Sequence, residues 1–171
     1  MESDIRLRSP NATDGMSVHQ LIDRCQPLDP NSSYCNLLQC THFSDTCVIA
    51  SASSDEQDVY GFISAYQKPA APDTLFVWQV AVDSRARGQG LASKMLDEIL
   101  SRPALNEVRY IETTITADND ASQRLFQAFA RRYQAEHDVN EFFDRQRHFK
   151  DQHDSELLHR IGPIVRPAPA S

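Results

Sequence analysis

The sequence predicts a single α/β (α+β) domain, and three observations lead to that prediction. The chain has 171 residues, which is enough for one domain with a buried core. Short apolar runs rich in β-branched residues alternate with segments of helical periodicity, as in a sheet covered by helices. Hydrophobic residues make up 40% of the chain and charged residues 24%, as in ordinary globular proteins. We expect the domain to span residues 1–165, followed by a disordered tail at 166–171.

The N-terminal half predicts one strand, two helices and a β-hairpin, in that order. The predicted strands are residues 5–8, 46–51 and 59–66. The predicted helices are residues 18–25, which Pro27 interrupts, and residues 34–43. The predicted connections are an acidic turn at 53–58 within the hairpin and a proline-containing loop at 67–73. Together these elements predict an antiparallel start to the sheet.

The C-terminal half predicts strands and helices in alternation. The predicted strands, each rich in apolar or β-branched residues, are 75–82, 108–116 and 157–164. A helix is expected from Leu91 until Pro103 ends it, with one apolar face. That face comprises Leu91, Met95, Leu96, Ile99 and Leu100. A second helix follows residues 117–120 and directs Leu125, Phe126 and Phe129 inward. Residues 134–153 are ambiguous, with Phe142, Phe143 and Phe149 as expected anchors.

The most basic local segment joins the strand at 75–82 to the helix at Leu91. Gly88 and Gly90 lie in this turn, beside Arg85, Arg87 and Lys94. A glycine turn before a helix directs free backbone N–H groups at an anion, and glycine admits a phosphate where a Cβ would block it. The turn therefore predicts a pyrophosphate site, whereas the alternative is a surface turn with charged side chains. Neither the dinucleotide pattern G-x-G-x-x-G nor the Walker pattern is present.

The sequence Arg87-Gly88-Gln89-Gly90-Leu91-Ala92 resembles the R-x-x-G-x-A signature of the GNAT-type N-acetyltransferase superfamily. The resemblance implies a GNAT fold, a mixed central sheet splayed near its middle with helices on both faces. It also implies acetyl-CoA as cosubstrate, and the N–H near Val80 as a donor to the developing oxyanion. The implied cofactor-binding residues are Val80, Ala81, Val82, Arg87, Gly88, Gln89, Gly90, Leu91, Ala92 and Ser93. A second register, Arg85-x-x-Gly88-x-Gly90, also matches the signature.

Residues 116–126 resemble the second CoA segment of the superfamily, N-x-x-A/S-x-x-L-Y/F. By this resemblance Asn119 and Ser122 contact the pantetheine arm, whereas the alternative is that Asn119 only caps a helix. Two departures bear on mechanism. Many relatives have a Tyr acid where this chain has Phe126, which cannot donate a proton, and some have a Glu base where it has Thr114. The acid and base must therefore come from other residues or from solvent.

Five co-linear segments resemble the L-2,4-diaminobutyrate acetyltransferases of ectoine biosynthesis. They are residues 28–38, 42–47, 62–66, 75–83 and 160–163. The resemblance implies acetyl transfer to the 4-amino group of L-2,4-diaminobutyrate. The implied substrate-binding residues are Asp29, Tyr34, Trp78, His153 and Glu156. Because Phe126 cannot act as the acid, we expect Tyr34 to protonate the thiolate or orient the amine, or Glu156 to hold one ammonium group and help deprotonate the other through water, with the N–H near Val80 at the oxyanion. The plain alternatives are a turn residue for Asp29, core aromatics for Tyr34 and Trp78, and a solvated face for His153 and Glu156.

Charge and composition restrict the partners. A net charge of −7 argues against nucleic acid and suits a cationic small substrate. No apolar run predicts a membrane span or a signal peptide, so we expect a cytoplasmic protein with no membrane partner. The four cysteines form no C-x-x-C pair, so we expect no metal. A homodimer is expected from the resemblance alone. Another amine or a protein N-terminus as acceptor, or a non-catalytic CoA-binding module, are the competing hypotheses.

Overall fold

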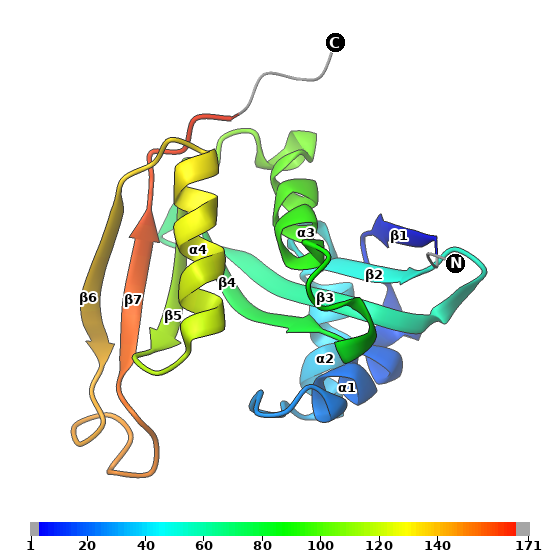
Figure 1. Cartoon of the computed structure of the whole chain (residues 1–171), viewed down its shortest axis with the longest axis horizontal. Coiled ribbons are helices and arrows are strands. Elements are labelled where there is room, and N and C mark those ends of the chain that lie inside the picture. The colour runs from blue at the N-terminus through cyan, green and yellow to red at the C-terminus, as the bar shows by residue number, and fades with distance from the viewer. Residues whose placement is uncertain (1–3, 167–171) are drawn as a thin grey trace. The chain divides into compact units, whose positions relative to one another are not determined.

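A computed structural model describes residues 4–166, in which a seven-stranded sheet has the order β1-β2-β3-β4-β5-β7-β6 (Figure 1). The strands are β1 (Ile5–Arg8), β2 (Val48–Ala52), β3 (Asp55–Lys68), β4 (Ala71–Val82), β5 (Tyr110–Thr116), β6 (His137–Phe143) and β7 (Glu156–Ile161). The helices are α1 (Gly15–Arg24), α2 (Ser33–Thr41), α3 (Leu91–Leu100) and α4 (Asp120–Arg132). Strands β4 and β5 are neighbours joined through α3, the kind of crossover that parallel strands require, so the sheet is mixed.

The chain forms two compact units, which are described separately. The first unit comprises residues 1–66 and 77–106, and the second comprises residues 67–76 and 107–171. The expected tail at 166–171 lies outside the described residues apart from Arg166, whose guanidinium donates to the Val108 carbonyl at 3.0 Å. The expected single domain at 1–165 stays a prediction.

In the first unit, helices cover both faces of the sheet. Phe62 on β3 belongs to a buried cluster with Val18 and Leu21 of α1. At the neighbouring Gly61, a Cβ would lie 2.9 Å from the Met95 side chain of α3. Because successive residues of a strand point to opposite faces, α1 and α3 pack on opposite faces of this part of the sheet. The apolar face predicted for α3 is buried along its whole length.

In the second unit, β7 lies between β5 and β6, and both pairings are antiparallel. Phe126 and Phe129 on α4 are buried, as predicted, whereas Leu125 is half-buried. Glu112 on β5 is also buried, and it pairs with Lys68 Nζ at 3.0 Å and Arg160 Nη1 at 3.2 Å. Two cations thus compensate the one carboxylate buried in this strand.

Two predicted connections and one predicted strand are shorter than expected. The loop predicted at 67–73 is a turn between Lys68 and Ala71, because Pro72 lies in an exposed part of β4 where its missing N–H costs nothing. The acidic turn predicted at 53–58 is also short, since β3 already begins at Asp55. The last strand ends at Ile161 and not at residue 164, because Gly162 has a positive φ and Pro163 follows it.

The ambiguous segment at 134–153 forms β6 and a series of turns. The prediction that Phe142 and Phe143 anchor this segment is wrong, because their side chains are 44% and 40% exposed. Phe143 contacts both Phe142 and the half-buried Phe149, so the three rings form a surface cluster. Hydrophobicity alone predicted burial, but β6 is the last strand of the sheet and has a neighbour on one side only.

Candidate active site

The glycine turn lies at the C-terminal end of β4, between Val82 and the first residue of α3. A short 3-10 helix, η3 (Ser84–Ala86), comes first, and its N-cap Asp83 accepts a hydrogen bond from the Arg85 backbone N–H at 2.9 Å. Gly88 and Gly90 then adopt φ values of +76° and +72°. Glycine enters this left-handed region without the steric cost that a Cβ brings. The two glycines thus turn the chain from the strand into the helix.

The N-terminus of α3 is uncapped. Gly90 is its N-cap residue and offers no side chain to the N–H groups of the first turn, which comprises Leu91, Ala92 and Ser93. A Cβ built at Gly88 or at Gly90 would meet nothing within 4 Å, so the surface above the turn is open. Unpaired N–H groups at an open helix start form an anion site. The turn therefore fits the pyrophosphate of CoA.

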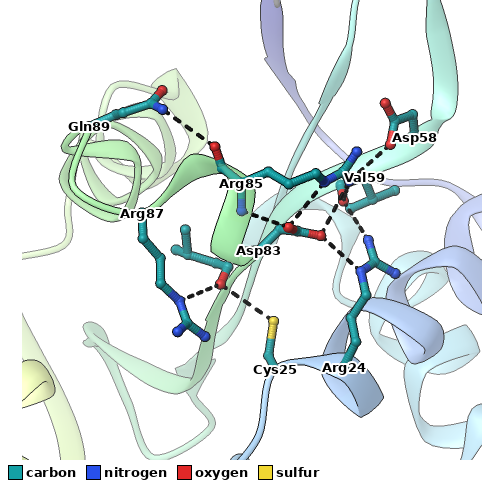
Figure 2. A network of polar contacts seen from close by, with 9 residues as sticks. Arg24, Cys25, Asp58, Val59, Asp83, Arg85, Arg87 and Gln89 are labelled. Carbon is teal, nitrogen blue, oxygen red and sulfur yellow. Dashed lines mark hydrogen bonds and ion pairs between the residues drawn. The ribbon is translucent and has the colours of Figure 1, made fainter.

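Asp83 forms ion pairs with two arginines next to the turn, Arg24 and Arg85 (Figure 2). Its side chain is 5% exposed and accepts from Arg24 Nε at 2.8 Å and from Arg85 Nε at 3.1 Å. Arg85 Nη2 also lies 3.0 Å from Asp58, and its guanidinium stacks 4.3 Å from the centre of the Tyr60 ring. Burial alone would raise the pKa of Asp83, but the hydrogen bonds from Arg85 and Arg24 outweigh it and hold that pKa well below its usual range. Arg85 is thus committed to carboxylates.

Arg87 differs from Arg85 in every one of these contacts. Its side chain is exposed, and its Nε donates to the Val82 carbonyl at 3.4 Å (Figure 2). The same carbonyl accepts a hydrogen bond from the Cys25 thiol, and burial raises the pKa of that thiol. The geometry thus favours the Arg87 register of the signature, because a phosphate would compete with carboxylates for Arg85 but not for Arg87. Gln89 is exposed and donates to the Arg85 carbonyl at 3.4 Å.

The second CoA segment lies in the second unit, at the start of α4. The Asn119 side chain accepts from the Ser122 backbone N–H at 3.2 Å, so Asn119 does cap the helix. Asn119 is exposed, and Ser122 is half-buried. Capping does not exclude a contact with pantetheine, and that contact stays a prediction.

In the first unit, three of the predicted substrate residues lie at or near the loop between α1 and α2. The Asp29 carbonyl accepts from Gln79 Nε2 at 3.0 Å, and Asn31 donates to the same Gln79 side chain at 3.4 Å. Gln79 lies beside Trp78 in β4, so the loop is fastened to that strand. Tyr34, in the first turn of α2, is 68% exposed, and Trp78 is 43% exposed. Neither is a core aromatic residue.

The other two predicted substrate residues lie together in the second unit. His153 Nε2 is 3.9 Å from Glu156 Oε1, and their side chains are 33% and 19% exposed. The ring of Phe149 lies 4.6 Å from that of His153, centre to centre. A carboxylate that is mostly withdrawn from solvent binds an ammonium group more strongly than a fully solvated one does. Among residues 4–166, no group of three or more His, Cys, Asp or Glu side chains is placed to hold a metal ion.

Sequence analysis missed Asp83 and Gln79. Both interrupt or end an apolar strand with a polar side chain, which is a signal of a specific partner, but the partners lie 48 to 59 residues away in the chain. At the two positions where the superfamily often places its acid and base, Phe126 is buried and Thr114 is half-buried. The described part of the chain has no helix that is both long and apolar enough to cross a membrane.

Comparison with known proteins identifies the class. Residues 16–130 match the acetyltransferase (GNAT) family, and the chain belongs to this family. The L-2,4-diaminobutyric acid acetyltransferase of Methylotuvimicrobium alcaliphilum is 51% identical over 160 residues, which cover 94% of this chain and 91% of that protein. The enzyme of the same name from Vibrio parahaemolyticus is 51% identical over 154 residues, covering 90% of this chain and 83% of that protein.

A solved structure shows the same similarity. The diaminobutyrate acetyltransferase of Paenibacillus lautus, in complex with its substrate L-2,4-diaminobutyric acid and coenzyme A, is 41% identical and superposes with a TM-score of 0.88. The match covers 96% of this chain and 98% of that one. Within the GNAT family, the chain belongs to the L-2,4-diaminobutyric acid acetyltransferases.

Proposed function

We infer that the chain transfers an acetyl group from acetyl-CoA to the 4-amino group of L-2,4-diaminobutyrate, giving 4-acetamido-2-aminobutanoate. The observation that carries this inference is the similarity over nearly the whole chain to enzymes of that name, at up to 51% identity. The uncapped glycine turn and the exposed Arg87 support it from the structure. The enzyme is thus an acyltransferase.

The cofactor side follows from the turn. The N–H groups from Gly88 to Ser93 and the Arg87 guanidinium bind the pyrophosphate, as an uncapped helix start and a cation do. Residues Val80, Ala81 and Val82 lie along the acyl arm, and Asn119 and Ser122 contact the pantetheine. When bound, acetyl-CoA supplies the activated thioester. The Val80 N–H donates to the acyl oxygen as negative charge develops there.

The substrate has two ammonium groups and one carboxylate, so its recognition needs carboxylates on the protein. Glu156 pairs with an ammonium group, with His153 beside it and the Phe149 ring next to His153. Asp29 offers the second carboxylate, on a loop that Gln79 holds in place. Trp78 and Tyr34 are exposed aromatic side chains that line the substrate. These five assignments rest on the resemblance and on the exposure and charge of each side chain.

Counted from the ammonium form, the substrate nitrogen loses two protons, one before attack and one as the amide forms, and the CoA sulfur takes up one, so one proton is released overall. The amine nitrogen forms a bond to the acyl carbon, and the C–S bond breaks. An alkylammonium group has a pKa of about 10, so it must lose a proton before its nitrogen can attack the thioester. Phe126 and Thr114 offer no ionisable group for either transfer. We assign the deprotonation to Glu156, acting through water, and the protonation of the sulfur to the Tyr34 hydroxyl.

We also propose the wider setting on the family resemblance alone. The protein acts in ectoine biosynthesis, in the cytoplasm, as a homodimer whose protomers each hold one catalytic domain at residues 1–165. The acidic net charge of −7 favours the approach of a cationic substrate. Size-exclusion chromatography with light scattering tests the dimer, and a monomer at working concentration contradicts it.

The activity is tested by incubating the purified chain with acetyl-CoA and a panel of amines while following thiol release. The panel contains L-2,4-diaminobutyrate, L-ornithine, L-lysine, putrescine and a short peptide with a free N-terminus. We expect L-2,4-diaminobutyrate to give the highest kcat/KM, and NMR of the product to place the acetyl group on N4. Acetylation of the α-amine, or a preference for the peptide, would overturn the inference.

A further inference from the structure

The Asp83 side chain accepts four hydrogen bonds next to the glycine turn, and the proposed chemistry gives it no role. One of its oxygens accepts from the Arg85 backbone N–H at 2.9 Å and from Arg85 Nε at 3.1 Å. The other accepts from Arg24 Nε at 2.8 Å and from Arg85 Nη2 at 3.2 Å. Its own backbone N–H donates to the Tyr60 carbonyl at 2.8 Å. The residue is thus fixed on β3, on α1 and on the turn at once.

These contacts do two separable things. The bond to the Arg85 backbone N–H caps η3, and therefore sets the direction in which the chain enters Gly88 and Gly90. The bonds to the two guanidinium groups balance their charge and keep Arg85 turned towards Asp58 (Figure 2), with its guanidinium over the Tyr60 ring. Arg87 is then the arginine of the turn that has no carboxylate partner among residues 4–166. The Asp83 carboxylate could thus both orient the N–H groups of the glycine turn and determine which arginine is available to a phosphate.

We propose that Asp83 is a positioning residue for cofactor binding, which fixes the turn and withholds Arg85 and Arg24 from the phosphates so that Arg87 engages them. The inference rests on the proposed function, because it concerns the CoA site of that reaction. Asp83 acts through the turn and through the arginines, and it does not touch the cofactor.

The chain contains a matched control in Asp14. That carboxylate is equally buried, at 1% exposed against 4%, and is held by Arg8 in two bonds of 2.7 and 2.8 Å. It also accepts a backbone N–H, that of Asn11, at 2.8 Å. Asp14 precedes α1 and has no contact with the glycine turn among the interactions described for residues 4–166. Asp14→Asn therefore reports what the loss of a buried Asp–Arg pair does to stability alone.

The experiment measures CoA binding by isothermal titration calorimetry for the wild type, Asp83→Asn, Asp83→Ala and Asp14→Asn. Asparagine keeps an acceptor for the Arg85 backbone N–H but turns an NH2 group towards two guanidinium donors, and alanine removes both functions. We expect the Kd for CoA to rise about tenfold in Asp83→Asn, which corresponds to ~1.4 kcal/mol, and further in Asp83→Ala. Asp14→Asn lowers the melting temperature and leaves the Kd unchanged. Instability alone reduces the number of binding sites per chain, not the affinity of folded molecules.

Steady-state kinetics give a second readout. Asp83→Asn should raise the KM for acetyl-CoA while kcat and the KM for the diamine stay at wild-type values. A wild-type Kd in Asp83→Asn, or an equal rise in Asp14→Asn, overturns the proposal. If Asp83→Asn does not fold, Asp83→Asn combined with Arg24→Gln removes one of the opposed donors, and a wild-type Kd in that variant overturns the proposal equally. A wild type that fails to bind CoA refutes the proposed function instead.

Discussion

Alanine substitution of Arg87 and of Arg85 should separate affinity from stability. Arg87 is exposed and has no ion pair with a carboxylate among residues 4–166, and its Nε lies 3.4 Å from the Val82 carbonyl. Its loss should change the free energy of unfolding by no more than about 0.5 kcal/mol. If Arg87 binds phosphate, its loss removes hydrogen bonds to a charged group, worth about 1.5–3 kcal/mol. The Kd for CoA should therefore rise roughly 10- to 150-fold.

Arg85→Ala should instead lower the free energy of unfolding and leave the Kd for CoA nearly unchanged. It removes the ion pairs with Asp83 and Asp58 and the stacking on Tyr60. The Arg85 side chain is 47% exposed, so solvent screens these pairs, and Asp83 keeps Arg24 as a partner. We expect the free energy of unfolding to fall by about 1–3 kcal/mol, and the Kd for CoA to change by less than about threefold.

Titration calorimetry with CoA and urea unfolding measure the two quantities on the same preparations. The refuting result is an exchange of the two profiles. If Arg85→Ala weakens CoA binding more than Arg87→Ala does, then Arg85 is the phosphate ligand and the register Arg85-x-x-Gly88-x-Gly90 is the correct one. If neither variant changes the Kd, the turn does not bind the pyrophosphate.

Three further predictions concern other parts of the protein. Gly90→Val should abolish CoA binding in a folded but destabilised chain, because valine is strained at φ +72° and its branch enters the open anion site; calorimetry on the folded variant checks this, and retained affinity contradicts it. Tyr34→Phe should lower kcat with little change in the KM for the diamine, whereas Glu156→Gln should mainly raise that KM, in thiol-release kinetics; a Tyr34→Phe enzyme with wild-type kcat at every pH removes Tyr34 from the mechanism. His137 and His159 lie 2.9 Å apart, ring nitrogen to ring nitrogen, and burial lowers the pKa of both rings, so folding favours their neutral forms. The free energy of unfolding should accordingly fall as pH drops below about 6.5, and His159→Gln should reduce that pH dependence in urea titrations.

Much of the fold follows from local patterns in the sequence. The strand before the glycine turn, the buried face of α3 and the inward phenylalanines of α4 all have a period that matches their structure. The failures occur where burial depends on distant neighbours. Phe142 and Phe143 are as apolar as any core residue, yet they lie on the last strand of the sheet and remain exposed. A local sequence pattern does not show whether a strand lies at the edge of the sheet or between two other strands.

In the candidate site too, residues of a local motif were predictable and residues with distant partners were not. Gly88, Gly90 and Arg87 are contiguous, so a short motif was enough to find them. Asp83 was invisible as a functional residue because its meaning comes from Arg24, which lies 59 residues earlier in the chain. The sequence left two arginine registers open, and only the contacts of Arg85 with Asp58 and Asp83 favour one of them.

The phenylalanine at the usual acid position excludes one source of the proton that the CoA sulfur takes up. Phe126 is 2% exposed, so its ring serves the packing of α4 and could not be replaced by a hydroxyl acid without a buried partner for that hydroxyl. The amine presents the harder problem, because an ammonium group near pKa 10 must lose a proton at neutral pH, whereas a thiolate can take one from water. A carboxylate held 3.9 Å from an imidazole, as Glu156 is from His153, can both attract the ammonium group and accept its proton through water. Loss of Glu156 should therefore cost more catalytic efficiency than loss of the Tyr34 hydroxyl.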